Sequence, residues 1–414
     1  MNQKTISLLL VALGMWLCAA PSTFGYTCTK MSLNDHISGA LLIVAAVLST
    51  FIFSKKNIIF FLIMGLWLNF APLAFWAPDP TSFLNDTLVG LITLSLAFRF
   101  KEIEGLPEVE GGEAPSGWSF NPSAYGPRIC TVFLAIFSWF LSRYLAAFQL
   151  GYIQNIWDPF FGAQTIKVLT SSVASSFPVS DAGLGAMGYS LEAFLGWQGN
   201  SQRWRTMPWV VVLFGILVVP AGLVSIFLVV MQPIVVGSWC GLCILIASCM
   251  LIMVMLTVTE MVAAVQFLSQ MRRRHNSFWT PFWRGVEVKT TDMKLSDSWG
   301  VSFSWRLIAC VLLGVWLMIS PALFGVKGSV TDANYTAGPL IVAVSIVSLS
   351  EVVRSFRYVN ILLALWIFLA HFIFAEPSGI LMVSNPIAAI LVIYLSLFKG
   401  KIKQTYGELT HRIR

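Results

Sequence analysis

Apolar and polar segments alternate along the whole chain, and the apolar segments are long enough to form helices. We expect helices near residues 5–24, 37–53, 57–76, 86–100, 129–148, 181–197, 208–231, 239–263, 307–324, 337–353, 359–375 and 386–399. A helix needs about 20 apolar residues to cross a bilayer, and the shorter segments indicate tilt or a locally thin membrane. The pattern therefore predicts an all-α, polytopic membrane protein with about twelve transmembrane helices.

The composition supports a membrane protein and argues against a nucleic-acid-binding one. Of the 414 residues, 57% are hydrophobic and only 11% are charged, whereas soluble domains carry about 25% charged residues. The net charge of +7 is weak evidence for nucleic acid, because membrane proteins concentrate Lys and Arg in their cytoplasmic loops. No RNA-binding signature or basic stripe is visible, so we expect no nucleic-acid partner.

The basic residues gather on one side of the predicted helices, which fixes the expected orientation. With a cytoplasmic N-terminus, the cytoplasmic side holds Lys55, Lys56, Arg99, Lys101, Arg128, Arg203, Arg205, Arg272, Arg273, Arg274, Arg284, Lys289, Arg354, Arg357, Lys399, Lys401 and Lys403. The clearest basic residues on the outer side are Lys30, Lys167 and Lys327. The positive-inside rule thus predicts that both termini are cytoplasmic. We expect the bacterial cytoplasmic membrane as the location.

The two ends of the chain share a pattern that the centre lacks. "VALGMWLCAAPSTFGY" at 11–26 matches "VLLGVWLMISPALFGV" at 311–326, and the match continues through the following helices. Such repeats identify architecture directly. We expect five parts: a first repeat of four helices at 1–102, a linker at 103–127, a central four-helix bundle at 128–272, a linker at 273–305 and a second four-helix repeat at 306–414.

A Cys-x-x-Cys pair, Cys240 and Cys243, opens the last helix of the central bundle. Two residues three apart share one helix face, where a disulfide fits. The helix N-terminus stabilises a thiolate on Cys240, and Trp239 is placed to shield the sulfurs. The competing interpretation is a pair of small buried hydrophobic residues, because free cysteines are often buried. The four scattered histidines give no zinc spacing, and we expect no metal site.

The order of elements in the centre resembles the vitamin K epoxide reductase family. A helix and an outer loop precede a short helix with a Gly-x-x-x-Tyr stretch, Gly185 and Tyr189, and the fourth helix opens with the Cys-x-x-Cys pair. The resemblance implies a thiol–disulfide oxidoreductase whose bundle holds a quinone of the menaquinone or ubiquinone type. Cys240 would face a thioredoxin-like or other thiol protein on the outer side, and Cys243 would contact quinone. The flanking repeats resemble SPW-repeat membrane domains.

The quinone pocket implied by this resemblance draws on residues around the predicted loop. We expect it to involve Asp181, Trp157, Phe160, Phe161, Tyr189 and Trp239. Asp181 falls where the family often has a quinone-binding Asn, but it also suits an N-cap of the helix that it opens. The "DPFFG" segment at 158–162 suits either a turn or an aromatic lid.

The chain departs from the family pattern in two places. The loop from Gln149 to Ser180 contains no cysteine, so the pair that passes electrons to protein partners is missing. Ala247 stands where the family has an aromatic hydroxyl, and Cys28 is more plausible as a passive loop residue than as a substitute. Two functions therefore remain open: a membrane thiol–disulfide oxidoreductase, and a non-catalytic scaffold or quinone-binding module that retains the bundle.

Overall fold

The computed structural model describes residues 3–51, 55–100, 108–111, 114–275, 278–290, 295–374 and 379–413. These residues form two compact units. One comprises Met1–Gly105 with Ile136–Phe194, and the other comprises Leu106–Ala135 with Leu195–Arg414. Because this division cuts through the central bundle, it does not test the five-part division expected from the sequence. Lys101 and the start of the first linker, at 103–107, lie outside the described residues.

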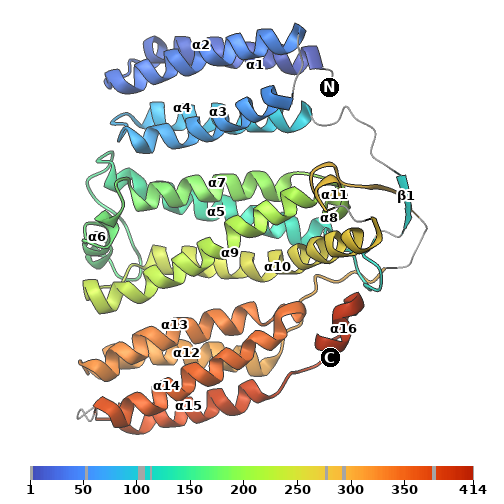
Figure 1. Cartoon of the computed structure of the whole chain (residues 1–414). Helices are drawn as coiled ribbons and strands as arrows, with labels where there is room; N and C mark the ends of the chain where they lie inside the picture. The colour runs from blue at the N-terminus through green and yellow to red at the C-terminus, as the bar shows by residue number, and fades with distance from the viewer. Residues whose placement is uncertain are drawn as a thin grey trace. The chain divides into compact units, whose positions relative to one another are not determined.

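The first compact unit is built mainly from long apolar helices, and a long loop that carries α6 joins α5 to α7 (Figure 1). Its elements are α1 (Gln3–Phe24), α2 (Thr29–Phe51), α3 (Lys55–Ala74), α4 (Pro80–Arg99), most of α5 (Tyr125–Gln149), α6 (Ala163–Leu169), the 3₁₀ turn η2 (Ala174–Ser176) and most of α7 (Asp181–Trp197). The pairs α1–α2 and α3–α4 pack as hairpins. Their shared core contains Leu10, Leu17, Leu42, Phe61 and Leu68, none with exposed surface.

The second compact unit contains the rest of the central bundle and the second repeat. Its helices are α8 (Arg203–Thr206), α9 (Pro208–Met231), the π-helical turn η3 (Gln232–Val236), α10 (Gly241–His275), α11 (Trp279–Arg284), α12 (Trp305–Leu323), α13 (Ser329–Val347), the 3₁₀ segment η4 (Glu351–Tyr358), α14 (Val359–Phe374), α15 (Leu381–Leu397), the short turn η5 (Gly407–Leu409) and α16 (Thr410–Ile413). α13 packs against α9, η3 and α10 as well as against α12 and α14.

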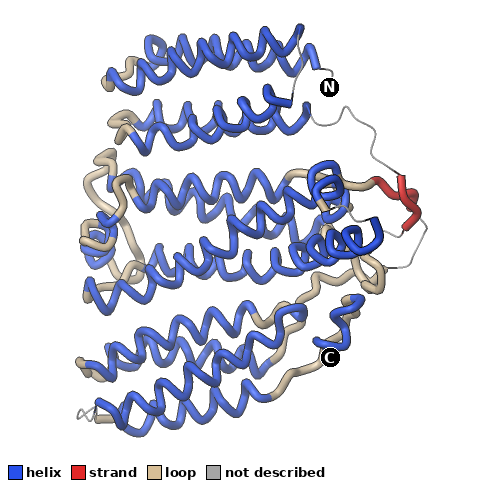
Figure 2. The backbone as a smooth tube through the Cα atoms, in the orientation of Figure 1, coloured by secondary structure: helices blue, strands red, loops and turns tan. Residues whose placement is uncertain are grey.

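Two short strands join the polar linkers, and with two isolated β-bridges, Trp118–Tyr406 and Val301–Ser350, they make up the β-structure in the described part of the chain. β1 (Glu108–Gly111) pairs in parallel with β2 (Glu287–Thr290), as Figure 2 shows in red. Each strand has four residues, so the expected all-α architecture holds apart from this contact between the linkers.

The helices bear out the expected membrane architecture. Ten of the described helical segments are long and apolar enough to cross a bilayer; these are α1, α2, α3, α4, α5, α9 with η3, α10, α12, α13 and η4 with α14. α7 and α15, with 17 residues each, fall just short of that length. Together these segments account for the twelve helices expected from the sequence. The chain is therefore an integral membrane protein.

Three helices begin six or more residues earlier than the hydrophobic pattern predicts. α2, α4 and α13 start at Thr29, Pro80 and Ser329 instead of near residues 37, 86 and 337. The pattern assigns their first polar residues to loops, but Asp35 and Asn334 have no exposed surface and lie within these helices. Buried polar groups are stable there because other side chains supply hydrogen bonds.

Candidate functional site

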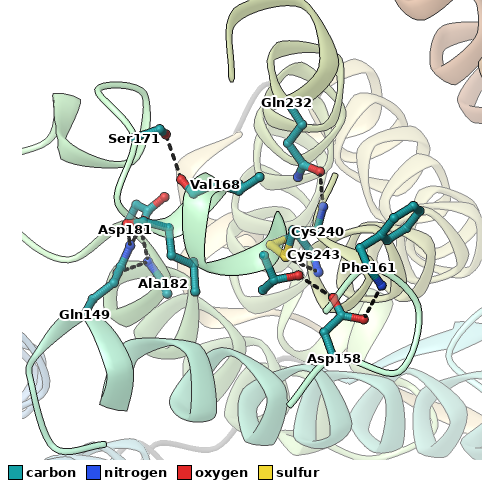
Figure 3. Close-up of a disulfide and its surroundings, with 12 residues drawn as sticks. Gln149, Asp158, Phe161, Val168, Ser171, Asp181, Ala182, Gln232, Cys240 and Cys243 are labelled. Carbon is teal, nitrogen blue, oxygen red and sulfur yellow. Dashed lines mark hydrogen bonds between the residues drawn. A yellow bond between two sulfur atoms is a disulfide. The ribbon is translucent and has the colours of Figure 1, made fainter. Parts of the chain in front are cut away.

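Cys240 and Cys243 are joined by a disulfide at the start of α10 (Figure 3), with their Cα atoms 5.3 Å apart. Cys240 immediately precedes the helix, and its Sγ accepts the backbone N–H of Cys243 at 3.1 Å. Cys240 therefore occupies the N-cap position, where the unpaired N–H groups of a helix favour negative charge. Cys240 has no exposed surface, whereas Cys243 is half-buried.

A glutamine that the sequence analysis missed braces the turn before the disulfide. The backbone oxygen of Gln232 accepts the N–H groups of Gly237 and Ser238, and its side-chain Oε1 accepts the Cys240 N–H at 2.9 Å. Gly237 adopts a left-handed conformation with φ 64°, which glycine accommodates without strain. Gln232 is 4% exposed, and its amide nitrogen has no hydrogen-bond partner among the described residues. A polar residue ending the long apolar α9 segment is the signal that could have revealed it.

Trp239 links the disulfide turn to the second repeat. The Trp239 side chain is half-buried, and its ring meets Tyr335 of α13 edge-on, with centroids 5.6 Å apart. Such aromatic contacts stabilise packed elements beyond simple burial. The second repeat thus braces the segment that carries the cysteines, a role for Trp239 in addition to the shielding expected of it.

The "DPFFG" segment is a turn organised by Asp158. The Asp158 carboxylate accepts the N–H groups of Phe160 at 2.8 Å and Phe161 at 3.2 Å, and also the hydroxyl of Thr165 (Figure 3). This arrangement is an Asx turn, so the turn interpretation is confirmed. Trp157 and Phe160 are 72% and 70% exposed, and Phe161 is half-buried. Their participation in an aromatic lid stays a prediction.

Ser180, and not Asp181, is the N-cap of α7. The Ser180 hydroxyl accepts the Gly183 N–H at 2.9 Å and donates to Oε1 of Gln149. Asp181 is the first helical residue, and its Oδ1 accepts the Ala182 N–H and the Gln149 amide (Figure 3). The capping role predicted for Asp181 is therefore wrong, because the residue before it already satisfies the helix end. Gln149, at the end of α5, ties both residues to its own helix.

Two further residues of α7 are deeply buried. Tyr189 is 6% exposed, and a side chain at Gly185, one turn earlier, would come within 3.7 Å of its ring. Glu192 has no exposed surface, and neither carboxyl oxygen has a hydrogen-bond partner in the described part of the chain. The Glu192 carboxyl is therefore fully enclosed by the protein.

Two arginines make extensive buried polar contacts at the end of the central bundle that lies away from the disulfide. Arg203 forms a buried ion pair with Glu260, and two of its nitrogens lie 2.6 Å from the carboxylate oxygens. Arg128 donates to the backbone carbonyls of residues 196–200, at the end of α7. These bonds satisfy the last carbonyls of that helix, which have no partners within it. The arginines that mark the predicted cytoplasmic side therefore also hold the fold together.

Fold and site together define an integral, predominantly helical membrane protein with a disulfide at the N-terminus of a long helix. The model of the vitamin K epoxide reductase family matches residues 129–258. The SPW repeat domain model matches residues 4–99 and 304–399. The chain therefore contains a domain of the vitamin K epoxide reductase family between two SPW repeat domains, as the resemblance predicted. Neither the curated proteins nor the solved structures gave a match.

The family match supports a general class of chemistry. At the level of the family, it supports a membrane oxidoreductase that is linked to a quinone and exchanges electrons with thiol proteins.

Proposed function

We propose that this protein is a membrane thiol–disulfide oxidoreductase that couples the Cys240–Cys243 pair to the membrane quinone pool. The observation that carries the proposal is the disulfide at the start of α10, where one sulfur is buried as a helix cap and the other is half-exposed. The proposed setting is the bacterial cytoplasmic membrane, with both termini cytoplasmic and the disulfide at the outer face. The partner is a thioredoxin-like or other thiol protein on that face.

The geometry favours Cys243 as the sulfur that a partner thiolate attacks. Attack forms a mixed disulfide with Cys243, breaks the Cys240–Cys243 bond and releases Cys240 as a thiolate. The Cys243 N–H and the helix N-terminus stabilise that leaving group. A second partner thiolate then attacks the mixed disulfide, so that the partner becomes oxidised and the pair takes up two protons. This order reverses the roles expected from the resemblance, because Cys240 is the buried sulfur.

The residues beside the disulfide fit a quinone. Quinone carbonyls accept hydrogen bonds, and the Gln232 amide nitrogen is a donor without a protein partner among the described residues, on a side chain already bonded to the Cys240 backbone. Asp181 suits the task less well than an asparagine, because an ionised carboxylate only accepts hydrogen bonds. The contributions of Trp157, Phe160, Phe161, Tyr189 and Trp239 to quinone binding stay predictions from the sequence. A bound menaquinone or ubiquinone would take up the two electrons and two protons of the dithiol.

The first test follows the redox state of the pair in membranes that contain the full-length protein. After mild reduction and removal of the reductant, a short-chain ubiquinone is added and free thiols are trapped with a mass-shifting alkylator. We expect Cys240 and Cys243 to lose their reactivity together while quinol forms, because two electrons leave per disulfide. Cys243→Ser should abolish quinol formation, and Cys28→Ser should leave it unchanged.

The alternative is a non-catalytic scaffold or quinone-binding module. It is favoured by one observation, the absence of any cysteine from Gln149 to Ser180, which removes the usual route to protein partners. A pair whose redox state does not respond to quinone would support this alternative. Loss of quinol formation in Cys28→Ser would instead show that electrons pass through a substitute shuttle cysteine.

A further inference from the structure

The first SPW repeat contains two buried carboxyl groups that lie side by side within the membrane domain. Asp35 of α2 and Asp86 of α4 have no exposed surface and lie within hydrogen-bonding reach of each other. The amide nitrogen of Asn34 donates to both, at 3.1 Å to Asp35 and 3.4 Å to Asp86. The amide of Asn85 also donates to Asp86, at 3.4 Å. Neither acid forms an ion pair among the described residues.

Two tryptophans fix the orientation of these amides. The indole N–H of Trp16 donates to Oδ1 of Asn85 at 2.8 Å, and that of Trp67 donates to Oδ1 of Asn34 at 2.9 Å. An indole nitrogen can only donate, so each amide oxygen must face its tryptophan and each amide nitrogen must face the acids. The donors available to the pair are therefore neutral, and they cannot offset two negative charges.

Two solvent-inaccessible oxygens at the pair lack a hydrogen bond of good geometry among the described residues. They are Oδ2 of Asp35 and the hydroxyl of Tyr26, and the Tyr26 hydroxyl lies close enough to the Asp35 carboxyl to interact with it as a neutral donor. Tyr26 lies in the turn between α1 and α2, and burial together with the neighbouring Asp35 and Asp86 raises its pKa. Its hydroxyl therefore keeps its hydrogen. Nearby, His36 bonds to the Ser32 carbonyl and Asp79 to Thr27, while α3 carries no titratable residue between Asn57 and Ala74.

The second SPW repeat provides an internal reference for the same two positions. Asn334 and Asn385 replace Asp35 and Asp86 in the matched sequence, and both are buried. Each amide donates to the oxygen of the other, at 3.1 and 2.9 Å. In the second repeat, the two side chains at these positions are therefore held together by N–H groups that each side chain donates to the other. Carboxylates bring no hydrogen of their own, so the corresponding bond in the first repeat needs a bound proton.

We propose that Asp35 and Asp86 form a proton-binding site in which one proton is shared between the two carboxyl groups at neutral pH. Sharing removes one of two like charges from a low-dielectric interior and creates a hydrogen bond between the acids. The site lies about 9 Å from the starts of α2 and α4, given the rise per residue of a helix. Tyr26 lies at that end, so the proton exchanges with water through the α1–α2 turn. The second repeat holds no such proton.

Infrared spectroscopy of the full-length protein in lipid nanodiscs tests this proposal, because a protonated carboxyl has its own C=O stretch. We expect a band at neutral pH that shifts in heavy water and when aspartate carries ¹³C at its side-chain carbonyl. The Asp35→Asn/Asp86→Asn double variant copies the second repeat and should lose the band. Glu192→Gln is the matched control, because it removes another buried carboxyl and should leave the labelled aspartate band in place.

The labelling arm needs no substitution, so poor folding of the double variant would not block the test. An aspartate band that the double variant leaves unchanged would overturn the proposal, as would a wild-type protein without any such band. A band that appears only when sodium is withheld would show a cation site in place of a proton site. None of these outcomes depends on the cysteines, so the result is independent of the proposed redox function.

Discussion

The two SPW repeats cross their first two helices in the same way. In the first repeat, a Cβ atom on Gly39 would lie 2.6 Å from the backbone oxygen of Gly14, and in the second a Cβ on Gly338 would lie 2.9 Å from that of Gly314. Such distances leave room only for hydrogen, so the backbones touch at both crossings. The matched glycines therefore preserve the same close helix crossing in both repeats.

The polar groups near these crossings differ. The first repeat places Asp35 and Asp86 in a network of amides and indoles, whereas the second repeat has one self-satisfied amide pair. The supporting residues change too, because Asn34, Asn85 and Tyr26 are matched by Ala333, Ser384 and Val326. Close backbone contact therefore fixes how the first two helices cross in both repeats. The buried polar residues differ between the repeats and can serve different functions.

The largest loss of stability is expected when an acidic residue is introduced into the second repeat. Asn334→Asp places a carboxyl opposite Asn385 without the donors that support Asp35 in the first repeat. Leaving an uncompensated charge buried in this way costs about 3 kcal/mol or more. We expect a marked fall in the thermal unfolding midpoint in nanodiscs at neutral pH, and a smaller fall in acid, where the new carboxyl is neutral.

Asp35→Asn is the matched change in the first repeat, and it should lower the midpoint much less because it removes a charge instead of adding one. Equal losses for the two variants would mean that the two polar centres tolerate charge alike. The proposed difference between the two repeats in how they hold a buried carboxyl would then be contradicted.

A smaller loss of stability is expected from substitutions at the two helix crossings, and it should be equal in the two repeats. Gly39→Ala and Gly338→Ala each force a methyl group against a backbone carbonyl. Overpacking of this kind costs about 1–3 kcal/mol, which outweighs the roughly 1 kcal/mol that alanine gains over glycine in a helix. Gly188→Ala in α7 is the control, because no atom lies within 4 Å of the position that its methyl group would take. The thermal unfolding midpoint should fall equally for Gly39→Ala and Gly338→Ala, and it should not fall for Gly188→Ala. Unequal losses for Gly39→Ala and Gly338→Ala would show that the two helix crossings differ.

The sequence was most informative where hydrophobic periodicity and covalent spacing decide the outcome. The helix pattern located the membrane segments, and the match at 11–26 and 311–326 revealed the repeats. The spacing of Cys240 and Cys243 allowed the disulfide that the structure contains. These features can be read from the order of residues within one segment, or by comparing two segments, without knowledge of three-dimensional contacts.

Features that depend on contacts distant in the sequence were missed. Asp35 appeared to belong to a loop because its partner Asp86 lies on another helix. Gln149 braces the turn before α7 from more than 30 residues away. Gln232 acts through a turn whose geometry depends on a π-helical end to α9. No periodicity marks such residues, because a single polar side chain carries no pattern.

The smallest difference is expected at the matched tryptophans Trp16 and Trp316. Both rings meet a phenylalanine edge-on, at 5.8 Å in the first repeat and 6.1 Å in the second, so substitution by phenylalanine preserves this contact. Only Trp16 donates a hydrogen bond to a matched amide, because Ser384 replaces Asn85 in the second repeat. Trp16→Phe should therefore cost about 1 kcal/mol and Trp316→Phe less than about 0.5 kcal/mol. Unfolding midpoints measured side by side would show the difference, and equal values would mean that the Trp16 bond does not support the acid pair.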